Sequence, residues 1–317
     1  MPTRISSAVV ALAWAGAAFT AQDPAKGMTL TQDKTQLLAA LNGKPVLRYK
    51  FAEVPFKPYV QELYSPGGVN ILRDAPADHL HHHALMYAMS VNGIDFWAET
   101  PNAGTQVHQA FAATWTDGGT RARFRETLAW IDPAAKKRVL DEARTIAVVK
   151  PAALDAVILS WVSEFSVPEG LAEATLSGSH YHGLGLQFPV SMDAGGECRN
   201  SAGIKGEVFR GEERLVPADW CAYTAKAEGK EVTVAMFGLP ANVRAPTLWF
   251  AMSGPFAYLS ATIGLYKEPL KIQRGKPLVL AYGVAVWDGR PDDATIAMTC
   301  ARWVARMQRP SAAEAAK

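Results

Sequence analysis

The chain has 317 residues, of which nearly half are hydrophobic, and its 32 basic and 30 acidic side chains leave a net charge of +2. This length suffices for one large β domain or for two ordinary domains with a substantial core. The balanced charge and the lack of a long Lys/Arg run exclude a nucleic-acid-binding protein that works by phosphate neutralisation.

Residues 1–21 have the pattern of a secretory leader. Arg4 supplies a positive start, an apolar stretch runs from Ala8 to Phe19, and small residues continue to Ala21. The apolar stretch is shorter than the roughly 20 residues that span a bilayer, and it lacks the amphipathic period of an ordinary surface helix. We therefore expect export to the periplasm or the extracellular space, with no membrane span in the mature chain.

Three cysteines, Cys198, Cys221 and Cys300, are few for an exported protein. Because an oxidising compartment permits disulfides and the intervening loop is short, Cys198 and Cys221 are the candidate pair. Neither a Cys-x-x-Cys pair nor a Cys/His zinc spacing occurs in the sequence. With only three cysteines, the chain is not a disulfide scaffold.

From Val46 onward the sequence reads as short strands punctuated by Gly, Pro and Asp. The segment Arg121–Trp130 alternates polar and apolar residues, which predicts one wet and one packed face. The strands recur at intervals typical of an all-β sandwich, and they are too frequent for a parallel α/β sheet. Outside the hairpin described below, the expected strands are Val46–Phe51, Tyr59–Tyr64, Gln106–Thr116, Arg121–Ile131, Arg138–Val149, Ala156–Val167, Leu176–Phe188, Asp219–Ala225, Glu231–Gly238, Thr247–Ser253, Lys271–Gln273 and Pro277–Trp287.

Helix is predicted only at Lys34–Leu41 and at Asp292–Gln308, where apolar residues recur at helical spacing in the second segment. The predicted fold is one large antiparallel β-sandwich. Its organisation is a leader over residues 1–21, an N-terminal segment over residues 22–45, the sandwich over residues 46–290, and a C-terminal helix and tail over residues 291–317.

Four of the seven histidines fall within five positions, just before a predicted β-hairpin: His79, His81, His82 and His83. Asn92-Gly93 between two β-rich runs is the strongest short-range hairpin signal, and it pairs Leu85–Val91 with Ile94–Glu99. Counting back from the turn places Met86 opposite Glu99. This register brings Glu99 close to the histidine end of the hairpin.

The histidines suit two kinds of chemistry. Imidazole titrates near neutrality and a nearby carboxylate fixes its tautomer, which favours general acid–base catalysis. His-x-His on one strand also matches the geometry of cupin-type metal sites, as in His81/His83 and His180/His182. If the histidines continue the strand, His79, His81 and His83 share one face and His82 lies on the other.

Asp78-His79-Leu80-His81-His82-His83-Ala84-Leu85 is followed by Val91-Asn92-Gly93-Ile94-Asp95-Phe96-Trp97. These strings resemble the Asp-His-Pro-His-His-Arg-Gly and Val-Asn-Gly-Val-Asp-Phe-Trp signatures of the PmoA-like family, which comprises bacterial, frequently exported proteins of uncharacterised activity. Weaker matches extend the resemblance over roughly Val46 to Arg290, among them Tyr181-His182-Gly183-Leu184-Gly185-Leu186, Pro240 with Asn242, Arg244 and Trp249, and Tyr282-Gly283-Val284. The resemblance implies a galactose-mutarotase-like β-sandwich and a carbohydrate ligand, both by analogy.

The chain departs from the signatures of this family at several positions. His83 stands where the family usually has Arg, and Gln187 stands where an Arg is common, so two guanidiniums suited to carboxylate recognition are missing. The inherited label of the family, methane oxygenase, does not fit. A membrane monooxygenase subunit needs several apolar segments of about 20 residues, and even the leader falls short of that length.

We therefore predict an exported carbohydrate-active protein in which His81, His82 and Glu99 are the acid–base or orienting groups. The candidate substrate-binding residues are His182, Asn242, Arg244, Trp249 and His108. The sequence contains neither a GxGxxG nucleotide loop followed by a helix nor a GxSxG elbow. NAD, phosphoryl-transfer and α/β-hydrolase chemistry are therefore unsupported, and no organic cofactor is expected.

Two alternatives stay open. The first is a metal-dependent enzyme that binds a divalent cation, with His81, His83, His180 or His182 among its ligands. The second is a non-catalytic carbohydrate-binding or structural sandwich, in which the histidines only form a stabilising network. Single residues also have structural alternatives, such as a turn-capping donor for His79 and a loop-rigidifying role for Asn242 and Arg244.

Overall fold

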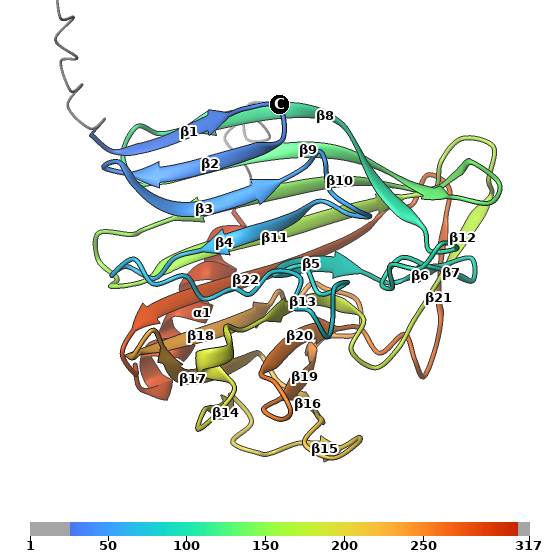
Figure 1. Ribbon diagram of the computed structural model, residues 1–317. Coiled ribbons are helices and arrows are strands. Elements are labelled where there is room, and N and C mark those ends of the chain that lie inside the picture. The colour runs from blue at the N-terminus through green and yellow to red at the C-terminus, as the bar shows by residue number, and fades with distance from the viewer. Residues whose placement is uncertain (1–25, 310–317) are drawn as a thin grey trace, which may run out of the picture.

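The computed structural model describes residues 26–309, so the predicted leader lies outside the described residues. Two large antiparallel sheets pack face to face, and a small sheet lies at one end of them (Figure 1). No helix within residues 26–309 is long and apolar enough to cross a membrane.

The first large sheet has ten strands, in the spatial order β1 (Met28–Gln32), β2 (Gln36–Leu41), β3 (Lys44–Lys50), β4 (Tyr59–Leu63), β5 (Leu85–Ala88), β13 (Gly183–Gln187), β20 (Tyr258–Thr262), β19 (Leu248–Met252), β16 (Arg214–Pro217) and β15 (Glu207–Val208). The second has eight, in the order β14 (Glu197–Asn200), β17 (Trp220–Ala227), β18 (Lys230–Gly238), β22 (Leu278–Asp288), β11 (Val157–Ser166), β10 (Lys137–Val149), β9 (Arg121–Asp132) and β8 (Thr105–Thr116). The small sheet contains β21 (Leu270–Gln273), β12 (Glu173–Ser177), β6 (Ser90–Val91) and β7 (Ile94–Asp95). A short 3₁₀ helix covers Val190–Met192.

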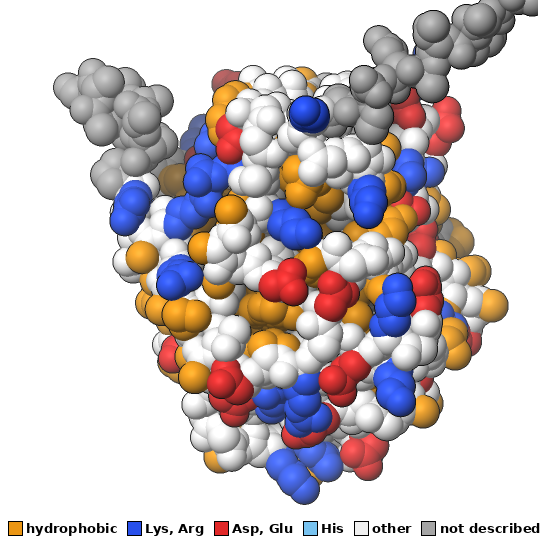
Figure 2. Space-filling view, turned by 90° about the vertical axis from the view of Figure 1, so that its left-hand side faces the viewer, with side chains coloured by type: hydrophobic (Ala, Val, Ile, Leu, Met, Phe, Trp, Pro, Cys, Tyr) orange, Lys and Arg blue, Asp and Glu red, His pale blue; other side chains and the backbone are white. Residues whose placement is uncertain are grey.

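Alternating side chains place the main core between the two large sheets. In β9, Ala122, Phe124 and Leu128 are buried, whereas Arg121 and Arg123 are exposed. Burial of the apolar face is the main driving force for this packing. The wet and packed faces predicted for this strand, and the large antiparallel β-sandwich predicted for the chain, are both confirmed. On the face shown in Figure 2, basic and acidic side chains are interspersed, as the balanced composition implies.

The helix α1 (Asp293–Met307) covers the outer face of the eight-stranded sheet. Its N-terminus is capped by Asp292, whose carboxylate accepts from the Thr295 amide at 2.8 Å. Its buried face packs Ile296 and Trp303 against apolar residues of the sheet. The C-terminal helix predicted from the sequence is confirmed.

The predicted N-terminal helix at Lys34–Leu41 is wrong, because this segment contains β2. Leu37 and Ala39 are buried, and β2 pairs with β1 on one side and β3 on the other. Leu and Ala favour helices, but helix propensity is a weak preference, and pairing with two neighbouring strands overrides it. Both β1 and β2 lie in the segment that sequence analysis had separated from the sandwich.

The Asn92-Gly93 hairpin is present, but it is shorter than predicted. Both turn residues have positive φ, 51° and 81°, as a two-residue type I′ turn requires, and the first two pairs beyond the turn have the expected register. The predicted pairing of Met86 with Glu99 is wrong. Met86 lies opposite Gly185 of β13, because β5 joins the ten-stranded sheet while the hairpin belongs to the small sheet.

The candidate disulfide is absent, and Cys198, Cys221 and Cys300 are all free thiols. Cys198 lies opposite Tyr223, whereas Cys221 lies opposite Asn200. The two cysteines are therefore diagonal neighbours across β14 and β17. Diagonal positions are about 7–8 Å apart, which exceeds the Cα separation that a disulfide tolerates.

Candidate active site

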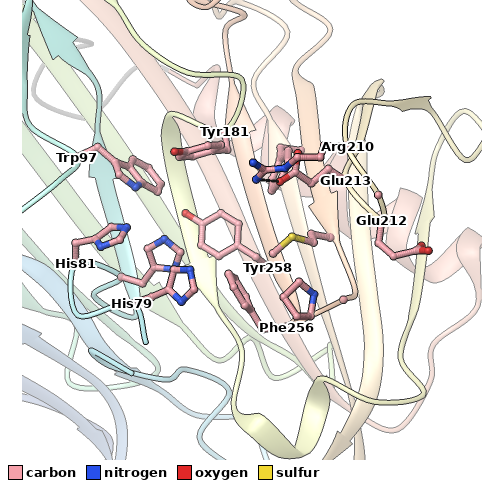
Figure 3. Close-up of a pocket in the computed structure, with 15 residues that line it drawn as sticks. His79, His81, Trp97, Tyr181, Arg210, Glu212, Glu213, Phe256 and Tyr258 are labelled. Carbon is pink, nitrogen blue, oxygen red and sulfur yellow. Dashed lines mark hydrogen bonds and ion pairs between the residues drawn. The ribbon is translucent and has the colours of Figure 1, made fainter. Parts of the chain in front are cut away.

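A cavity of about 540 Å³ lies over the β19–β20 part of the ten-stranded sheet. One wall is the histidine turn together with Trp97, and the opposite wall is the loop between β15 and β16 (Figure 3). The side chains and backbone that line it belong to His79, His81, His82, Trp97, Tyr181, Arg210, Gly211, Glu212, Glu213, Phe250, Met252, Gly254, Pro255, Phe256 and Tyr258.

The floor of the cavity is one face of two paired strands. Phe250 and Met252 of β19 line it, and Tyr258 lies opposite Met252 on β20. Successive side chains of a strand point to opposite faces, so Trp249 faces away from the cavity. Trp249 is fully buried, and its indole N–H donates to the Ala218 carbonyl oxygen at 2.7 Å. This predicted substrate-binding residue does not line the cavity.

The histidines lie in a hydrogen-bonded turn and do not continue β5. The His82 amide donates to the carbonyl oxygen of His79 at 2.9 Å, and Ala84 has a φ of 44° where the chain turns into the strand. The assignment of the histidines to two strand faces is therefore wrong. The turn brings His79, His81 and His82 to the cavity and leaves His83 outside it.

His82 is buried, and one of its ring nitrogens is held by the protein. Its Nδ1 lies 2.9 Å from Oε1 of Gln187, at the end of β13. An amide oxygen only accepts hydrogen bonds, so Nδ1 carries the proton and Nε2 keeps a lone pair. Burial lowers the pKa of His82 to about 3, although the bond to Gln187 opposes this shift. His82 is therefore a neutral hydrogen-bond acceptor near neutral pH.

His81 is half-buried, and its ring makes no hydrogen bond with any other residue in the range 26–309. Its ring lies at a right-angled contact with His82, with 4.5 Å between the ring centroids. Burial, followed by the ammonium group of Lys57, lowers the pKa of His81, and the Glu99 carboxylate opposes the shift. Both ring nitrogens of His81 are thus available to a ligand.

His83 is the centre of a buried charge cluster beside the cavity. Its Nδ1 lies 2.9 Å from Oδ1 of Asp74, and its Nε2 lies 2.8 Å from Oε1 of Glu99. Glu99 also accepts from the Lys57 ammonium at 2.8 Å, and it does not line the cavity. Burial alone would lower the pKa of His83, but the bonds to the two carboxylates raise it above its ordinary value. His83 is therefore held as a cation by two carboxylates.

The wall opposite the histidines carries charges that sequence analysis assigned no role. Glu213 is buried and accepts from the Arg210 guanidinium at 2.6 Å, while Nε2 of His180 lies 3.1 Å from its second oxygen. Glu212 lines the same wall. The string Arg210-Gly-Glu-Glu-Arg was the available signal, but only the fold shows that it faces the histidine turn.

His180 and His182 do not share a strand face, because both precede β13 in a turn. His182 stacks on Trp97, with 4.8 Å between the ring centroids and 8° between the planes, and it does not line the cavity. Burial lowers the pKa of His182 to about 4. The structure therefore separates the second predicted His-x-His pair.

Three other predicted substrate-binding residues are engaged away from the cavity. Asn242 exchanges hydrogen bonds of 2.9 and 2.8 Å with the backbone of Ala281. The Arg244 guanidinium donates to backbone carbonyl oxygens in the segment that follows β20. His108 lies with Nδ1 2.6 Å from the fully buried carboxylate of Glu126. None of the three is among the residues that line the cavity.

A model of a family of unknown function, DUF6807, matches residues 36–301. The chain belongs to the DUF6807 family. The matching model has a different name from the PmoA-like family, so the PmoA-like resemblance stays a prediction. No curated protein sequence is significantly similar to this DUF6807 chain.

Several solved structures are similar to this DUF6807 chain. An α-galactosidase from Geobacillus stearothermophilus, solved with raffinose, is 9% identical to this chain, with a TM-score of 0.47. The match covers 83% of this chain and 41% of the galactosidase chain. A putative mutarotase from Salmonella typhimurium is 10% identical with a TM-score of 0.40, covering 83% and 94%. A putative aldose 1-epimerase from Klebsiella pneumoniae is 10% identical with a TM-score of 0.33, covering 86% and 81%. The chain thus spans about two fifths of the length of the galactosidase.

The predicted metal ligands of this DUF6807 chain do not converge. Across residues 26–309, no group of three or more His, Cys, Asp or Glu side chains has an arrangement that could hold a metal ion. Both nitrogens of His83 are engaged by carboxylates, and His180 is paired with Glu213. The histidines that reach the cavity instead combine hydrogen-bond acceptors with a group able to take up a proton.

Proposed function

We propose that this protein binds a sugar or sugar derivative in the cavity and moves a proton on it. His81 is the acid–base group in this proposal, and His82 is a fixed hydrogen-bond acceptor. The observation that carries the proposal is the convergence of these two imidazoles with the charged loop Arg210–Glu213 across an aromatic floor.

The lining suits a polyol with one apolar ring face. The side chains of Trp97, Tyr181, Phe250 and Phe256 offer flat apolar surfaces against which the C–H face of a sugar ring can pack. The charged groups of the loop Arg210–Glu213 can donate to and accept from its hydroxyls. The volume of about 540 Å³ lies within the roughly 300–1,000 Å³ of small-molecule sites.

His81 is better suited to proton transfer than His82. A base with a pKa close to the working pH is the most effective, and deep burial keeps His82 neutral down to about pH 3. The less buried His81 ring takes a proton from the bound ligand, and the resulting imidazolium returns it to the same ligand molecule. Glu99, whose charge opposes the lowering of the His81 pKa, stabilises that imidazolium. The protons balance within one ligand, so the proposed reaction is of the isomerase type and needs no organic cofactor.

A screen of aldoses, ketoses and oxidised glycosides, followed by NMR, tests this function. His81→Ala should lower turnover by about 10²–10⁴-fold, the usual contribution of a positioned acid–base group. His82→Ala removes a hydrogen-bond acceptor and should lower turnover less, by about tenfold. Leu80→Ala, at a side chain in the same turn that is 62% exposed, is the matched control and should retain turnover. Equal turnover in His81→Ala and the unmutated protein would refute the proposed role. Thermal shifts with sugars but no turnover would indicate a binding protein.

We also propose that the protein acts outside the cytoplasm, on the basis of the leader pattern in residues 1–21. Fractionation of cells that express the full chain, with N-terminal sequencing of the product, tests this location. A cytoplasmic product that still begins at the first residues of the leader would refute it.

A further inference from the structure

Two buried hydrogen-bond donors beside the histidines have no partner in the protein. The indole N–H of Trp97 and the hydroxyl of Tyr258 belong to side chains that are 2% and 3% exposed, and neither is hydrogen-bonded within residues 26–309. Both side chains line the cavity. Leaving one buried donor unpaired costs about 1–3 kcal/mol, so two such donors in one cavity require an explanation.

Trp97 is held firmly in every other respect. Its ring stacks on His182 with 8° between the planes, and its backbone amide donates to the Asp95 carboxylate at 2.7 Å. Its carbonyl oxygen accepts from the buried Lys57 ammonium at 3.3 Å. The indole N–H is thus the one polar group of a fixed residue that the protein leaves unpaired.

The hydroxyl of Tyr258 reaches the same end of the cavity. Figure 3 shows it pointing toward Trp97 and the histidine wall, and the two ring centroids are 6.3 Å apart. The Tyr258 ring also lies 5.3 Å from that of His82. The hydroxyl fits against β13 only because residue 185 is glycine, since a Cβ atom there would lie 1.8 Å from it. Burial raises the pKa of Tyr258, so the group stays a neutral donor.

We propose that Trp97 and Tyr258 form a two-donor site for one carbonyl oxygen of a sugar derivative. This inference rests on the proposed function, and it names the class of substrate. An indole N–H can only donate, so the shared ligand atom must be an acceptor. A carbonyl oxygen offers two lone pairs and has no proton of its own, so both donors can bind it without any other partner. A hydroxyl oxygen would in addition occupy an acceptor such as Nε2 of His82.

The donor pair also accounts for how an imidazole could act on a carbon atom. When His81 removes a proton from the carbon next to the carbonyl group, the C–H electron pair forms a C=C bond, and the carbonyl π pair moves to oxygen. The resulting enolate oxygen carries the negative charge that the two donors stabilise. The His81 imidazolium returns the proton to the former carbonyl carbon, while the proton of the neighbouring hydroxyl group passes to the enolate oxygen. The carbonyl group thereby moves by one carbon, and no other reactant is consumed.

Matched ring compounds test the inference by calorimetry. The probes are 1,5-anhydro-D-glucitol, which has no carbonyl group, D-glucono-1,5-lactam, with one at C1, and 1,5-anhydro-D-fructose, with one at C2; galactose-configured analogues form a second set. We expect at least one carbonyl probe to bind about tenfold or more tightly than the polyol of its set. Trp97→Phe and Tyr258→Phe should each reduce this preference by about fivefold to tenfold, the value of one hydrogen bond.

Two conservative substitutions control for damage to the fold. Tyr258→Phe removes a hydroxyl without a protein partner, so its melting temperature should equal or exceed that of the unmutated protein. Tyr223→Phe should melt at a lower temperature, because the equally buried Tyr223 hydroxyl donates to the Met192 carbonyl oxygen at 2.6 Å. Trp249→Phe removes an indole bond that lies outside the cavity, and it should leave the preference for the carbonyl probe intact.

The outcomes separate this inference from the proposed function. Equal binding of carbonyl and polyol probes, or a preference that survives both Trp97→Phe and Tyr258→Phe, would overturn the two-donor site and leave sugar binding in place. If no probe of either set binds, both the inference and the proposed function are overturned.

Discussion

At the scale of single residues, the neighbours of each histidine decide what that histidine can do. His82 donates to an amide oxygen and is neutral, whereas the adjacent His83 lies between two carboxylates and is held as a cation. The pKa values of these two adjacent histidines therefore shift in opposite directions. Desolvation lowers the pKa of His82, whereas the bonds to two carboxylates outweigh desolvation and raise the pKa of His83.

The charge state of His82 can be reversed through Gln187. Gln187→Glu places a carboxylate beside Nδ1, which should raise the His82 pKa from about 3 toward neutrality. NMR titration of the histidine ring protons should show one additional histidine that titrates between pH 5 and 8. Gln109→Glu, an equal charge change at an exposed position of β8, should not add this titration. An unchanged titration in Gln187→Glu would contradict the assigned contact.

The His83 cluster makes stability depend on pH. The His83 pKa is raised above its ordinary value of 6.5, so the cation stabilises the fold fully below about pH 6.5. This contribution is lost as the pH rises through the raised pKa. The pKa values of Asp74 and Glu99 are lowered, so their contributions are present above the ordinary values of 3.8 and 4.5 and are lost as pH falls. The cluster should therefore stabilise the protein most between about pH 4.5 and 6.5.

His83→Gln tests this window. The difference in unfolding free energy between the unmutated protein and His83→Gln should be about 2–3 kcal/mol near pH 5.5, a typical value for hydrogen bonds between charged groups. Denaturant titrations across the pH range should show that the difference shrinks above pH 7. A difference that grew with increasing pH would contradict the assignment of His83 as a cation.

Part of the candidate site can be predicted from the sequence at the level of single residues. The density of histidines singled out His81 and His82, because that signal lies within five adjacent positions. The roles of Arg210 and Glu213 could not be predicted in this way. Their position across the cavity from the histidines depends on long-range strand pairing in the ten-stranded sheet. Composition and spacing contain no information on such a contact.

At the scale of elements, the periodicity of apolar residues predicted most strands correctly. It failed where helix propensity competed with pairing to neighbouring strands. Arg121–Ile131 alternates clearly and is a strand, and α1 lies where helical spacing predicted it. The segment at Lys34–Leu41 was misassigned because Leu and Ala favour helices, whereas its neighbours β1 and β3 are known only from the fold. The turn that holds the histidines was missed because local hydrogen bonds, not periodicity, define it.

Arg244 is expected to stabilise the contact between its own loop and the segment that follows β20. Its guanidinium donates to the Ile263 and Glu268 carbonyl oxygens at 3.0 and 2.7 Å. Arg244→Met should lower the unfolding free energy by about 1–3 kcal/mol, because these carbonyl groups lose a charged donor. Hydrogen exchange should accelerate in residues 263–269. Loss of ligand binding without any loss of stability would instead support the substrate-binding role predicted from the sequence.

At the scale of the whole molecule, a buried polar network ties the two large sheets together. Arg144 of β10 is fully buried and bonds Glu142 of the same strand at 2.8 and 2.9 Å. It also donates to the hydroxyl of Tyr49 in β3 and to the Pro58 carbonyl oxygen, at 3.0 and 2.9 Å. Glu142 and Arg144 are two residues apart and therefore share a strand face, but only the fold shows that this face is buried against the other sheet.

Removing one partner from this network should be costly. Arg144→Met leaves the Glu142 carboxylate buried without its cation, which should lower the unfolding free energy by about 3–5 kcal/mol. Adding Glu142→Gln should recover part of the loss in denaturant titrations. Arg125→Met removes a half-exposed ion pair with Glu164 and should cost less than about 1 kcal/mol. Equal losses in Arg144→Met and Arg125→Met would show that the buried network does not stabilise the fold.

The close approach of the Tyr258 hydroxyl to Gly185 also constrains how this sequence can evolve. With 1.8 Å between that hydroxyl and a Cβ atom at residue 185, even one methyl group would force the tyrosine to leave its position. Two residues on adjacent strands, distant in the chain, must therefore change together. A homologue that keeps tyrosine at the position of Tyr258 should keep glycine at the position of Gly185. Because the ring carbon Cζ would also lie 2.7 Å from such a Cβ atom, only a homologue that has lost the aromatic ring is free to accept alanine or serine there.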